Sequence, residues 1–360
     1  MSVLHVVGAR PNFMKAAPVL QALSRAGVPQ VLVHTGQHYD EAMSGRLFAQ
    51  LGLPTPDVNL NVGSASHAQQ TAAIMIGMEA QLLERRPRLV MVYGDVNSTV
   101  AAALVAAKIN IPVAHVEAGL RSFDRTMPEE INRMVTDRLA TLLFTPSADG
   151  DENLLREGTP PESIHRVGNV MIDSLLQCLP LASADHVLAA IGLAPPAPYV
   201  LVTLHRPATV DETGLLDGLL NSLRSLAERI PVVFPVHPRT KARIGDRAVA
   251  GIHLIEPVGY LEFLALERDA RLVITDSGGV QEETTFFKVP CITVRDNTER
   301  PVTITHGTNT LIGRDPDLLL ETAHAKLDAP KGDGRIPELW DGHAADRIAA
   351  VVTRWLSAGR

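Results

Sequence analysis

The chain has 360 residues, more than one hydrophobic core usually serves, so two domains of ordinary size are expected rather than a single small module. Hydrophobic residues make up 46% and charged residues 20%, the balance of a globular protein and not of a disordered chain. The formal net charge is −7 and aromatic residues are only 4%. Nucleic-acid binding needs a basic surface and stacking platforms, so the composition argues against it, and an acidic surface gives no reason to expect a membrane partner.

The cysteines and histidines give no sign of a disulfide framework or a metal site. Cys178 and Cys291 lie far apart and neither forms a CxxC pair, which fits a reduced, cytoplasmic location. His34 and His38 are separated by a turn-like segment and the chain has no HExxH phrase, so we expect no metal. The first apolar stretch ends at residues 8–11, too short for a signal peptide or a membrane span.

Short apolar runs bounded by turn residues alternate with longer helical patterns, which predicts an α/β fold with parallel sheets. The predicted strands are residues 3–7, 30–34, 89–93, 113–116, 142–145, 199–204, 232–236, 252–255, 272–275 and 291–294. The helices between them are predicted to begin near Asn12, Asp40, His67, Ser98, Glu129, Asp211, Tyr260, Gly278 and Asp315.

Each half of the chain has the pattern of a Rossmann-like domain, and two such domains imply a cleft between them. We place the N-terminal domain at residues 1–168 and the C-terminal domain at residues 169–340, since a strand is expected to end at Gly168. Residues 341–360 are predicted to contain a last helix, which is expected to pack back on the N-terminal domain or on the C-terminal domain.

Ligands of open α/β sheets bind beyond the carboxyl ends of the strands, so the residues that follow each predicted strand are the candidates for chemistry. After the first strand, a glycine turn carries Arg10 and Lys15 into a helix. A helix N-terminus with two cations predicts an anion site, although a plain strand–helix turn with solvated cations has the same pattern. The segment has no GxGxxG, and the chain has no Walker lysine motif, so a dinucleotide fingerprint is not supported.

Three carboxylate positions follow neighbouring strands of the N-terminal half. Asp95 and Glu117 come directly after predicted strands, and Glu129 and Glu130 occupy the first turn of a helix. Each has an ordinary alternative: a helix cap at Asp95, an ion pair of Glu117 with Arg121, and helix stabilisation by the two glutamates. Like charges close together raise at least one pKa, so the set as a whole predicts acid–base chemistry.

The C-terminal half supplies groups that suit a nucleoside diphosphate. His205 with Arg206 follows the first strand of this half, and a histidine beside an arginine at a strand end suits an anion. Further on, Ser277 opens a helix at two glycines, Gly278 and Gly279, which predicts a phosphate cradle. Glu283, about one helical turn in, is placed to reach a ribose diol, and the stretch 295–301 adds cations.

These phrases resemble those of the non-hydrolysing UDP-N-acetylglucosamine 2-epimerases, which have the two-Rossmann-domain architecture called GT-B. The resemblance covers essentially the whole chain. The phrases that carry it are GARPNFMKAAP, YGDVNSTVAAA, HVEAGLRS, MPEEINR, HRVGN, TDSGGVQEE and RDNTERP.

The resemblance implies interconversion of UDP-GlcNAc and UDP-ManNAc without a cofactor, through elimination of UDP to 2-acetamidoglucal and its re-addition. By resemblance, Asp95, Glu117 and Glu129 are the catalytic carboxylates and His205 acts near the diphosphate. The substrate-binding residues implied are Arg10 and Lys15 for phosphate, Ser277, Gly278 and Gly279 for the cradle, Phe263 for uracil, Glu283 for ribose, and Arg133 and Arg300 as further contacts. A homodimer in the cytoplasm that feeds polysaccharide synthesis is implied in the same way.

The same sequence features are compatible with other functions. Two phrases, residues 36–40 and 121–125, look like those of 2-epimerases acting on decorated UDP-sugars such as diacetamido-uronates. A hydrolysing 2-epimerase and a GT-B glycosyltransferase share the fold and the nucleotide, and a sugar-nucleotide sensor is the non-enzymatic alternative.

Overall fold

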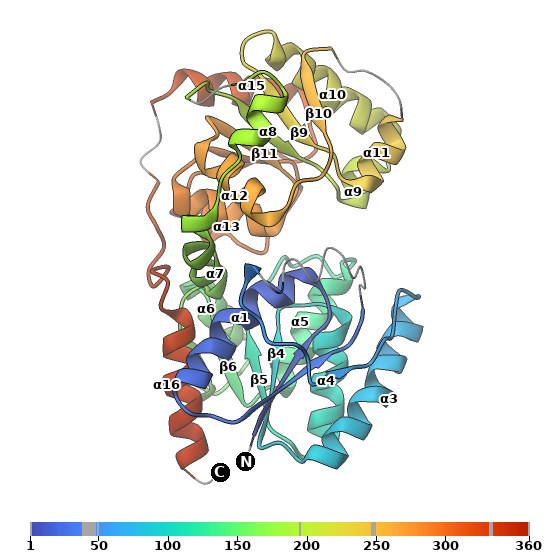
Figure 1. The fold of residues 1–360 in the computed structure, drawn as a ribbon, viewed down its shortest axis with the longest axis vertical. Helices are drawn as coiled ribbons and strands as arrows, with labels where there is room; N and C mark the ends of the chain where they lie inside the picture. Colours follow the sequence, from blue (N-terminus) through green and yellow to red (C-terminus); the bar gives the residue numbers. More distant parts are fainter. Residues whose placement is uncertain are drawn as a thin grey trace. The chain divides into compact units, whose positions relative to one another are not determined.

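The computed structural model describes residues 2–37, 48, 50–193, 196–245, 250–330 and 334–358 (Figure 1). The chain divides into two compact units. Unit 1 comprises Met1–Gln177 and Glu338–Arg360, and unit 2 comprises Cys178–Pro337. Each is built on a parallel sheet with helices on both faces, which confirms the predicted α/β fold class.

Unit 1 has a seven-stranded sheet in the order β3-β2-β1-β4-β5-β6-β7, and every neighbouring pair is parallel. Strands β1, β4, β5 and β6 are buried along their whole length, because helices cover both faces of the sheet. The strands are β1 (Val3–Val7), β2 (Gln30–His34), β3 (Val58–Asn59), β4 (Leu89–Tyr93), β5 (Val113–Val116), β6 (Leu142–Thr145) and β7 (Ile164–Arg166).

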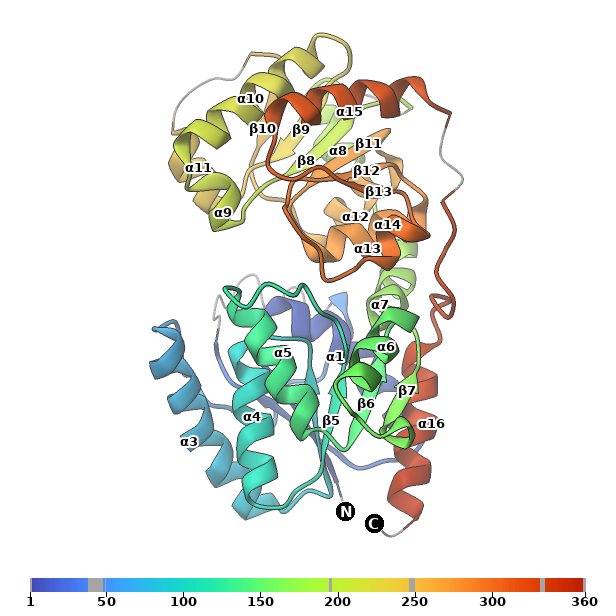
Figure 2. The same cartoon turned by 180° about the vertical axis from the view of Figure 1, so that it is seen from behind.

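The helices of unit 1 lie in two layers. Helices α3, α4 and α5 stand side by side over one face, and α1 and α16 pack together on the other (Figures 1 and 2). The helices are α1 (Arg10–Arg25), α3 (His67–Arg85), α4 (Asn97–Lys108), α5 (Pro128–Leu139), α6 (Ala148–Arg156), α7 (Val170–Cys178) and α16 (Ala344–Ser357).

Unit 2 has a six-stranded parallel sheet in the order β10-β9-β8-β11-β12-β13. Helices α10 and α15 close a core on one face, while α8, α12 and α13 close a second core on the other. The strands are β8 (Val200–Thr203), β9 (Val232–Pro235), β10 (Ile252–Ile255), β11 (Leu272–Thr275), β12 (Cys291–Thr293) and β13 (Asn309–Leu311). The helices are α8 (Asp185–Ala190), α9 (Pro207–Val210), α10 (Thr213–Ala227), α11 (Pro238–Ile244), α12 (Tyr260–Asp269), α13 (Gly278–Phe287), α14 (Val302–Thr305) and α15 (Pro316–Asp328).

The chain passes from one unit to the other at positions that differ from the predicted domain boundaries. The first connection lies after Gln177 and not after residue 168, because α7 belongs to unit 1. Its Asp173 accepts hydrogen bonds from the backbone N–H groups of Ala344 (3.2 Å) and Ala345 (2.7 Å), which open α16. The return begins at Glu338, three residues before the predicted last segment, and Trp340 Nε1 donates to Pro146 O at 3.0 Å inside unit 1.

All ten predicted strands are present, within two residues at each end, and the described residues form three more that were not predicted. The missed strands, β3, β7 and β13, are edge strands of two or three residues, too short to show an apolar run. The helix predicted near Asp40 and the histidine His38 lie outside the described residues. Within the described parts of the chain, no helix combines the length and apolar character needed to cross a membrane.

Candidate active site

The predicted site residues cluster where the strand order reverses. In unit 1 the order changes direction between β1 and β4, and in unit 2 between β8 and β11. At such a point the connecting helices leave to opposite faces, so the carboxyl ends of the two strands are open to a ligand. The groups around the first point are called the unit 1 site, and those around the second the unit 2 site.

A buried ion pair lies at the centre of the unit 1 site. Lys15 reaches from the second turn of α1 to Glu117 after β5, with 2.8 Å between Nζ and Oε1, and both residues are at most 5% exposed. Gly94 lies against this pair at a φ of +59°, and a Cβ there would stand 2.7 Å from Nζ. Glu117 itself has a φ of +71°, a left-handed conformation that costs a residue with a side chain about 1–2 kcal/mol. Backbone strain of this kind is concentrated at functional sites.

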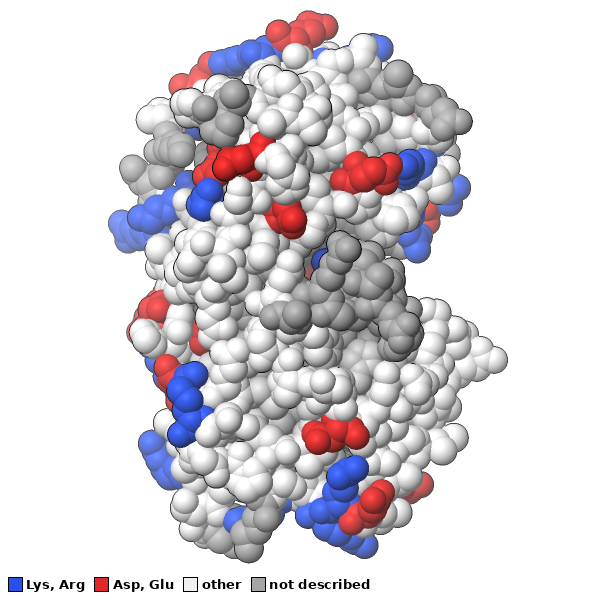
Figure 3. All heavy atoms as spheres, viewed as in Figure 1, with Lys and Arg blue, Asp and Glu red and all other residues white. Residues whose placement is uncertain are grey.

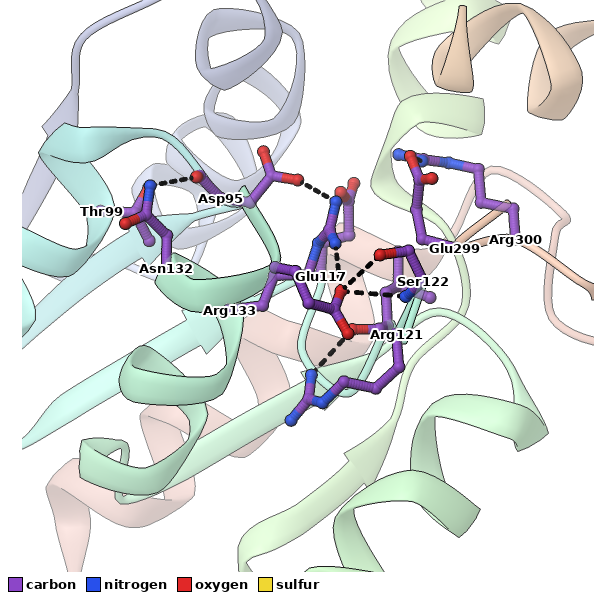
Figure 4. A network of polar contacts seen from close by, with 12 residues as sticks. Asp95, Thr99, Glu117, Arg121, Ser122, Asn132, Arg133, Glu299 and Arg300 are labelled. Carbon is purple, nitrogen blue, oxygen red and sulfur yellow. Dashed lines mark hydrogen bonds and ion pairs between the residues drawn. The ribbon is translucent and has the colours of Figure 1, made fainter. Parts of the chain in front are cut away.

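A second buried cation holds Asp95 (Figure 4). Arg133 of α5 donates to Asp95 Oδ2 at 2.6 Å and to Glu130 Oε2 at 2.7 Å. Asn132 from the same helix donates to the backbone carbonyl of Asp95 at 2.8 Å. Asp95 and Glu117 therefore follow two adjacent, parallel strands, and each has a buried cation in contact with its carboxylate.

The two neighbouring glutamates of α5 differ in their surroundings. Glu130 is buried and accepts hydrogen bonds from the N–H (2.9 Å) and Oγ (3.0 Å) of Ser122 and from the N–H of Phe123 (3.0 Å). It thereby fixes the loop that precedes α5. Glu129 is exposed on the first turn, and Arg10 is exposed as the first residue of α1.

A buried histidine supports the loop between β4 and α4. His115 contacts Asp137 through Nδ1 (2.6 Å) and the carbonyl oxygen of Gly94 through Nε2 (2.8 Å). The two contacts tie the His115 ring between α5 and the loop that carries Asp95. Burial alone would raise the pKa of Asp137, but the contacts with His115 and Arg121 outweigh the effect of burial and lower this pKa below its usual value. The alternative pairing of Arg121 with Glu117 is wrong, because Arg121 pairs with Asp137 and with Glu157, each at 2.7 Å.

The unit 2 site contains the predicted cradle. Ser277 caps α13 in an extended conformation after β11, and Gly278 and Gly279 form the first turn. A Cβ on Gly278 would lie 2.5 Å from Arg300 Nη1, whereas one on Gly279 would meet nothing within 4 Å. Arg300 is held by Glu282 (2.9 Å) and by Glu299. A buried guanidinium against an open helix N-terminus is suited to a diphosphate.

A carboxylate that the sequence analysis did not single out holds His205. Asp276 is fully buried and accepts from the backbone N–H groups of His205 (2.9 Å) and Arg206 (2.8 Å), with 3.1 Å to His205 Nδ1. Burial alone would raise the pKa of Asp276, but these groups keep it below its usual value. Nδ1 of His205 is thus engaged by Asp276, while the imidazole as a whole stays 37% exposed. Asp276 could have been found, because it precedes Ser277 in the phrase TDSGG.

The predicted ribose and uracil contacts lie on neighbouring helices of unit 2. Tyr260 Oη, at the start of α12, donates to Glu283 Oε1 of α13 at 2.9 Å. Phe263 follows Tyr260 by one helical turn and packs, partly buried, against the core beneath. A carboxylate and an aromatic ring thus lie on the helix that begins with the cradle and on the helix packed against it.

The chain is similar to proteins of a known family. A family model described as UDP-N-acetylglucosamine 2-epimerase matches residues 21–353. The chain belongs to this family. The predicted family, and with it the predicted class of enzyme, an isomerase, are confirmed.

Individual members of the UDP-N-acetylglucosamine 2-epimerase family are similar over almost their whole length. The chain is 42% identical to the UDP-N-acetylglucosamine 2-epimerase of Methanocaldococcus jannaschii, over 98% of this chain and 99% of that one. It is 41% identical to the UDP-2,3-diacetamido-2,3-dideoxy-D-glucuronate 2-epimerase of Pseudomonas aeruginosa, over 98% and 100%. The crystal structure of the M. jannaschii enzyme in complex with UDP-GlcNAc and UDP superimposes with a TM-score of 0.90, covering 98% of this chain and 100% of that one.

The charges outside the two sites have no common sign. On the face drawn in Figure 3, acidic and basic side chains of the described residues lie in small mixed groups. No cluster of three or more metal-ligating side chains is found in the part of the chain that the structure describes.

Proposed function

We propose that this epimerase interconverts UDP-GlcNAc and UDP-ManNAc at C2. The observation that carries the proposal is the pair of carboxylates Asp95 and Glu117, which follow adjacent strands and are compensated by Arg133 and Lys15. The M. jannaschii relative, a UDP-N-acetylglucosamine 2-epimerase with a crystal structure in complex with UDP-GlcNAc and UDP, supports the same substrate.

The groups of the unit 2 site suit the nucleotide. C2–H of the sugar is not acidified by a ketone, so its loss must be coupled to departure of the diphosphate from C1. The N–H groups of the α13 N-terminus, the Arg300 guanidinium and the His205 imidazole are proposed to donate hydrogen bonds that stabilise the departing diphosphate. Phe263 and Glu283 are proposed to bind uracil and ribose.

The groups of the unit 1 site suit the proton transfers. One carboxylate takes the C2 proton, the C2–H electron pair forms the C1=C2 double bond, and the C1–O electron pair leaves with UDP. The intermediate is 2-acetamidoglucal. In the return step a UDP oxygen attacks C1 while a proton is delivered to the other face of C2. Substrate and product have the same oxidation state, so the cycle needs no redox cofactor.

The roles of the three carboxylates are tested by amide substitutions. Asp95→Asn, Glu117→Gln and Glu129→Gln each remove one proton-transfer group, and we expect kcat to fall at least about 100-fold. Calorimetry with UDP should show a Kd within about 3-fold of the wild type, because these groups act on the sugar. The matched control is Glu152→Gln, an exposed carboxylate on α6, which should change neither quantity. A collapse of UDP affinity in the three variants would contradict the division of roles.

The reaction is tested by proton NMR with UDP-GlcNAc in D2O, without nucleotide cofactor, metal or acceptor. We expect a growing anomeric signal of UDP-ManNAc and deuterium at C2 of both sugars. Stoichiometric free UDP would instead indicate a hydrolysing epimerase, and turnover only with an added acceptor would indicate a glycosyltransferase. Binding of UDP without turnover of any UDP-sugar would favour the sensor.

A decorated sugar is the second candidate substrate. The observation that favours it is the relative from P. aeruginosa, whose identity of 41% is nearly that of the UDP-GlcNAc relative. The same NMR assay with UDP-2,3-diacetamido-2,3-dideoxy-D-glucuronate compares kcat/KM for the two sugars. A ratio above about 100 in favour of the uronate would replace the first proposal.

We also propose that the enzyme is a homodimer that uses the outer face of α3. This face carries exposed Ala72, Ala73, Ile76, Ala80 and Leu83, with Ile76 at 73% exposure. An apolar helix face of this kind marks an interaction site. Light scattering should give twice the mass of the chain, and Ile76→Glu should give the monomer. A monomeric wild type would contradict the proposal.

A cytoplasmic role in the supply of polysaccharide precursors is proposed as well. Its support is that Cys178 and Cys291 are both unpaired and buried, as suits a reducing compartment. Fractionation of cells that make the protein would test the location. Recovery outside the cytoplasm would contradict it.

A further inference from the structure

A second glutamate, Glu267, lies behind the predicted ribose ligand and has no role in the site described so far. It is on α12, one turn beyond Phe263 and two turns beyond Tyr260, so the three side chains share the face of the helix that meets α13. Its side chain is fully buried, and its carboxyl group interacts with that of Glu283. Neither oxygen of Glu267 accepts a hydrogen bond from any described group.

Two adjacent buried carboxyl groups cannot both be ionised without a cation. The proton therefore belongs on one of them, and the hydrogen bonds decide which. Glu283 accepts from Tyr260 Oη at 2.9 Å, which favours its charged form, whereas no group in the described ranges donates to Glu267. A protonated Glu267 has its O–H to donate, and Glu283 is the acceptor in reach.

Among the described residues, the other titratable groups that interact with the pair are a tyrosine and two cysteines. Burial raises the pKa of the Cys178 and Cys291 thiols to about 11, and the pKa of Tyr260 lies well above its usual value for the same reason. Burial and the neighbouring Glu283 raise the pKa of Glu267 well above its usual value. Burial raises the pKa of Glu283 too, but the hydrogen bonds from Glu267 and Tyr260 oppose this rise.

We propose that Glu267 is a positioning residue for nucleotide recognition: its protonated carboxyl donates to Glu283 and fixes it as the carboxylate that accepts the ribose hydroxyls. The inference rests on the proposed function, in which Glu283 binds the ribose of a UDP-sugar. Its consequence is discrimination between ribose and deoxyribose. The Glu283 carboxylate, which Tyr260 and Glu267 hold in place, loses a hydrogen-bond partner when the nucleotide lacks its 2′-hydroxyl.

The test compares the affinities for UDP and 2′-deoxy-UDP by calorimetry. We expect the wild type to bind UDP about 10-fold more tightly than 2′-deoxy-UDP. Glu267→Gln keeps a neutral donor of the same shape. The ratio of its two affinities, for UDP and for 2′-deoxy-UDP, should therefore stay within about 2-fold of the wild-type ratio. Glu267→Leu removes the donor, and its ratio should fall below about 3.

Kinetics separate positioning from a general structural role. Ribose binding is the same in ground and transition states, so Glu267→Leu should raise KM for UDP-GlcNAc about 10-fold with kcat within about 3-fold. If Glu267→Leu does not fold, Tyr260→Phe removes the other donor to Glu283 with little change of shape and should lower the same ratio. Thermal unfolding of each variant establishes that it is folded.

The outcomes distinguish this inference from the function on which it rests. The role of Glu267 alone would be overturned if Glu267→Leu still preferred UDP over 2′-deoxy-UDP as strongly as the wild type does. It would also be overturned if Glu267→Gln lost this preference as fully as Glu267→Leu. A wild type that binds UDP and does not discriminate against 2′-deoxy-UDP would overturn the ribose contact of Glu283 while leaving the epimerase function in place. A wild type that binds no UDP would overturn both.

Discussion

Gly94 offers a sharp test of the unit 1 site, because replacing it perturbs one ammonium group. A Cβ at residue 94 would lie 2.7 Å from Lys15 Nζ, so the ammonium must retreat by about 0.7 Å to reach an ordinary 3.4 Å contact. The end of a lysine moves easily, so this displacement costs little stability. It does move Lys15 away from the Glu117 carboxylate, and a misplacement of about 1 Å in an active site lowers the rate about 100-fold. We expect Gly94→Ala to lower kcat by about that factor.

The matched control is Gly27→Ala. Gly27 has a φ of +70°, close to the +59° of Gly94, and a Cβ there meets nothing within 4 Å. Alanine at such a φ costs about 1–2 kcal/mol, so in a unit of about 200 residues both variants should lose about 2–8 °C of Tm. Scanning calorimetry and the NMR assay measure the two quantities. Equal activity of the two variants would refute the reasoning, and so would a much larger Tm loss in Gly94→Ala.

Three further perturbations test other parts of the structure. Gly278→Ala forces its Cβ against Arg300, so calorimetry should show UDP binding weakened about 10- to 100-fold. The pKa of Asp276 is lowered in the folded protein, so its contribution to stability is present above about pH 4 and is lost below. The free energy of unfolding in urea should therefore change less between pH 5 and pH 3 for Asp276→Asn than for the wild type. Asp173 has a pKa raised by burial to about 6, so its folded form holds a proton that the unfolded chain releases near pH 4, and stability falls as the pH rises from about 4 to 6. Asp173→Asn should remove this loss, about 3 kcal/mol, and equal pH dependence of the two proteins would contradict the assignment.

The strands and the residues that follow them could be predicted because parallel sheets impose a regular pattern. Long buried strands such as β4 read as continuous apolar runs, and Asp95 and Glu117 were found as the first polar residues after such runs. The edge strand β3 has one partly buried and one exposed residue, so it gave no such signal.

The partners of the site residues could not be predicted, because they depend on distances between segments far apart in the chain. Lys15 and Glu117 are 102 residues apart, and nothing in either phrase indicates the pair. Glu130 and Glu129 are adjacent in sequence, and only the packing of α5 buries one and exposes the other. The domain boundary was placed too early because Gly168 looked like a strand end, whereas α7 beyond it is tied to α16 by Asp173.

The return of the chain to unit 1 has a consequence for how the protein is made. Unit 2 is inserted between α7 and α16, so a ribosome completes it before it has synthesised the last helix of unit 1. Until that helix emerges, Asp173 and the outer side of α1 lack their partners and are exposed to other nascent chains. The N-terminal part of the chain must therefore wait longest for its final structure, and substitutions in α16 should lower the yield of folded protein more than their effect on the mature enzyme implies.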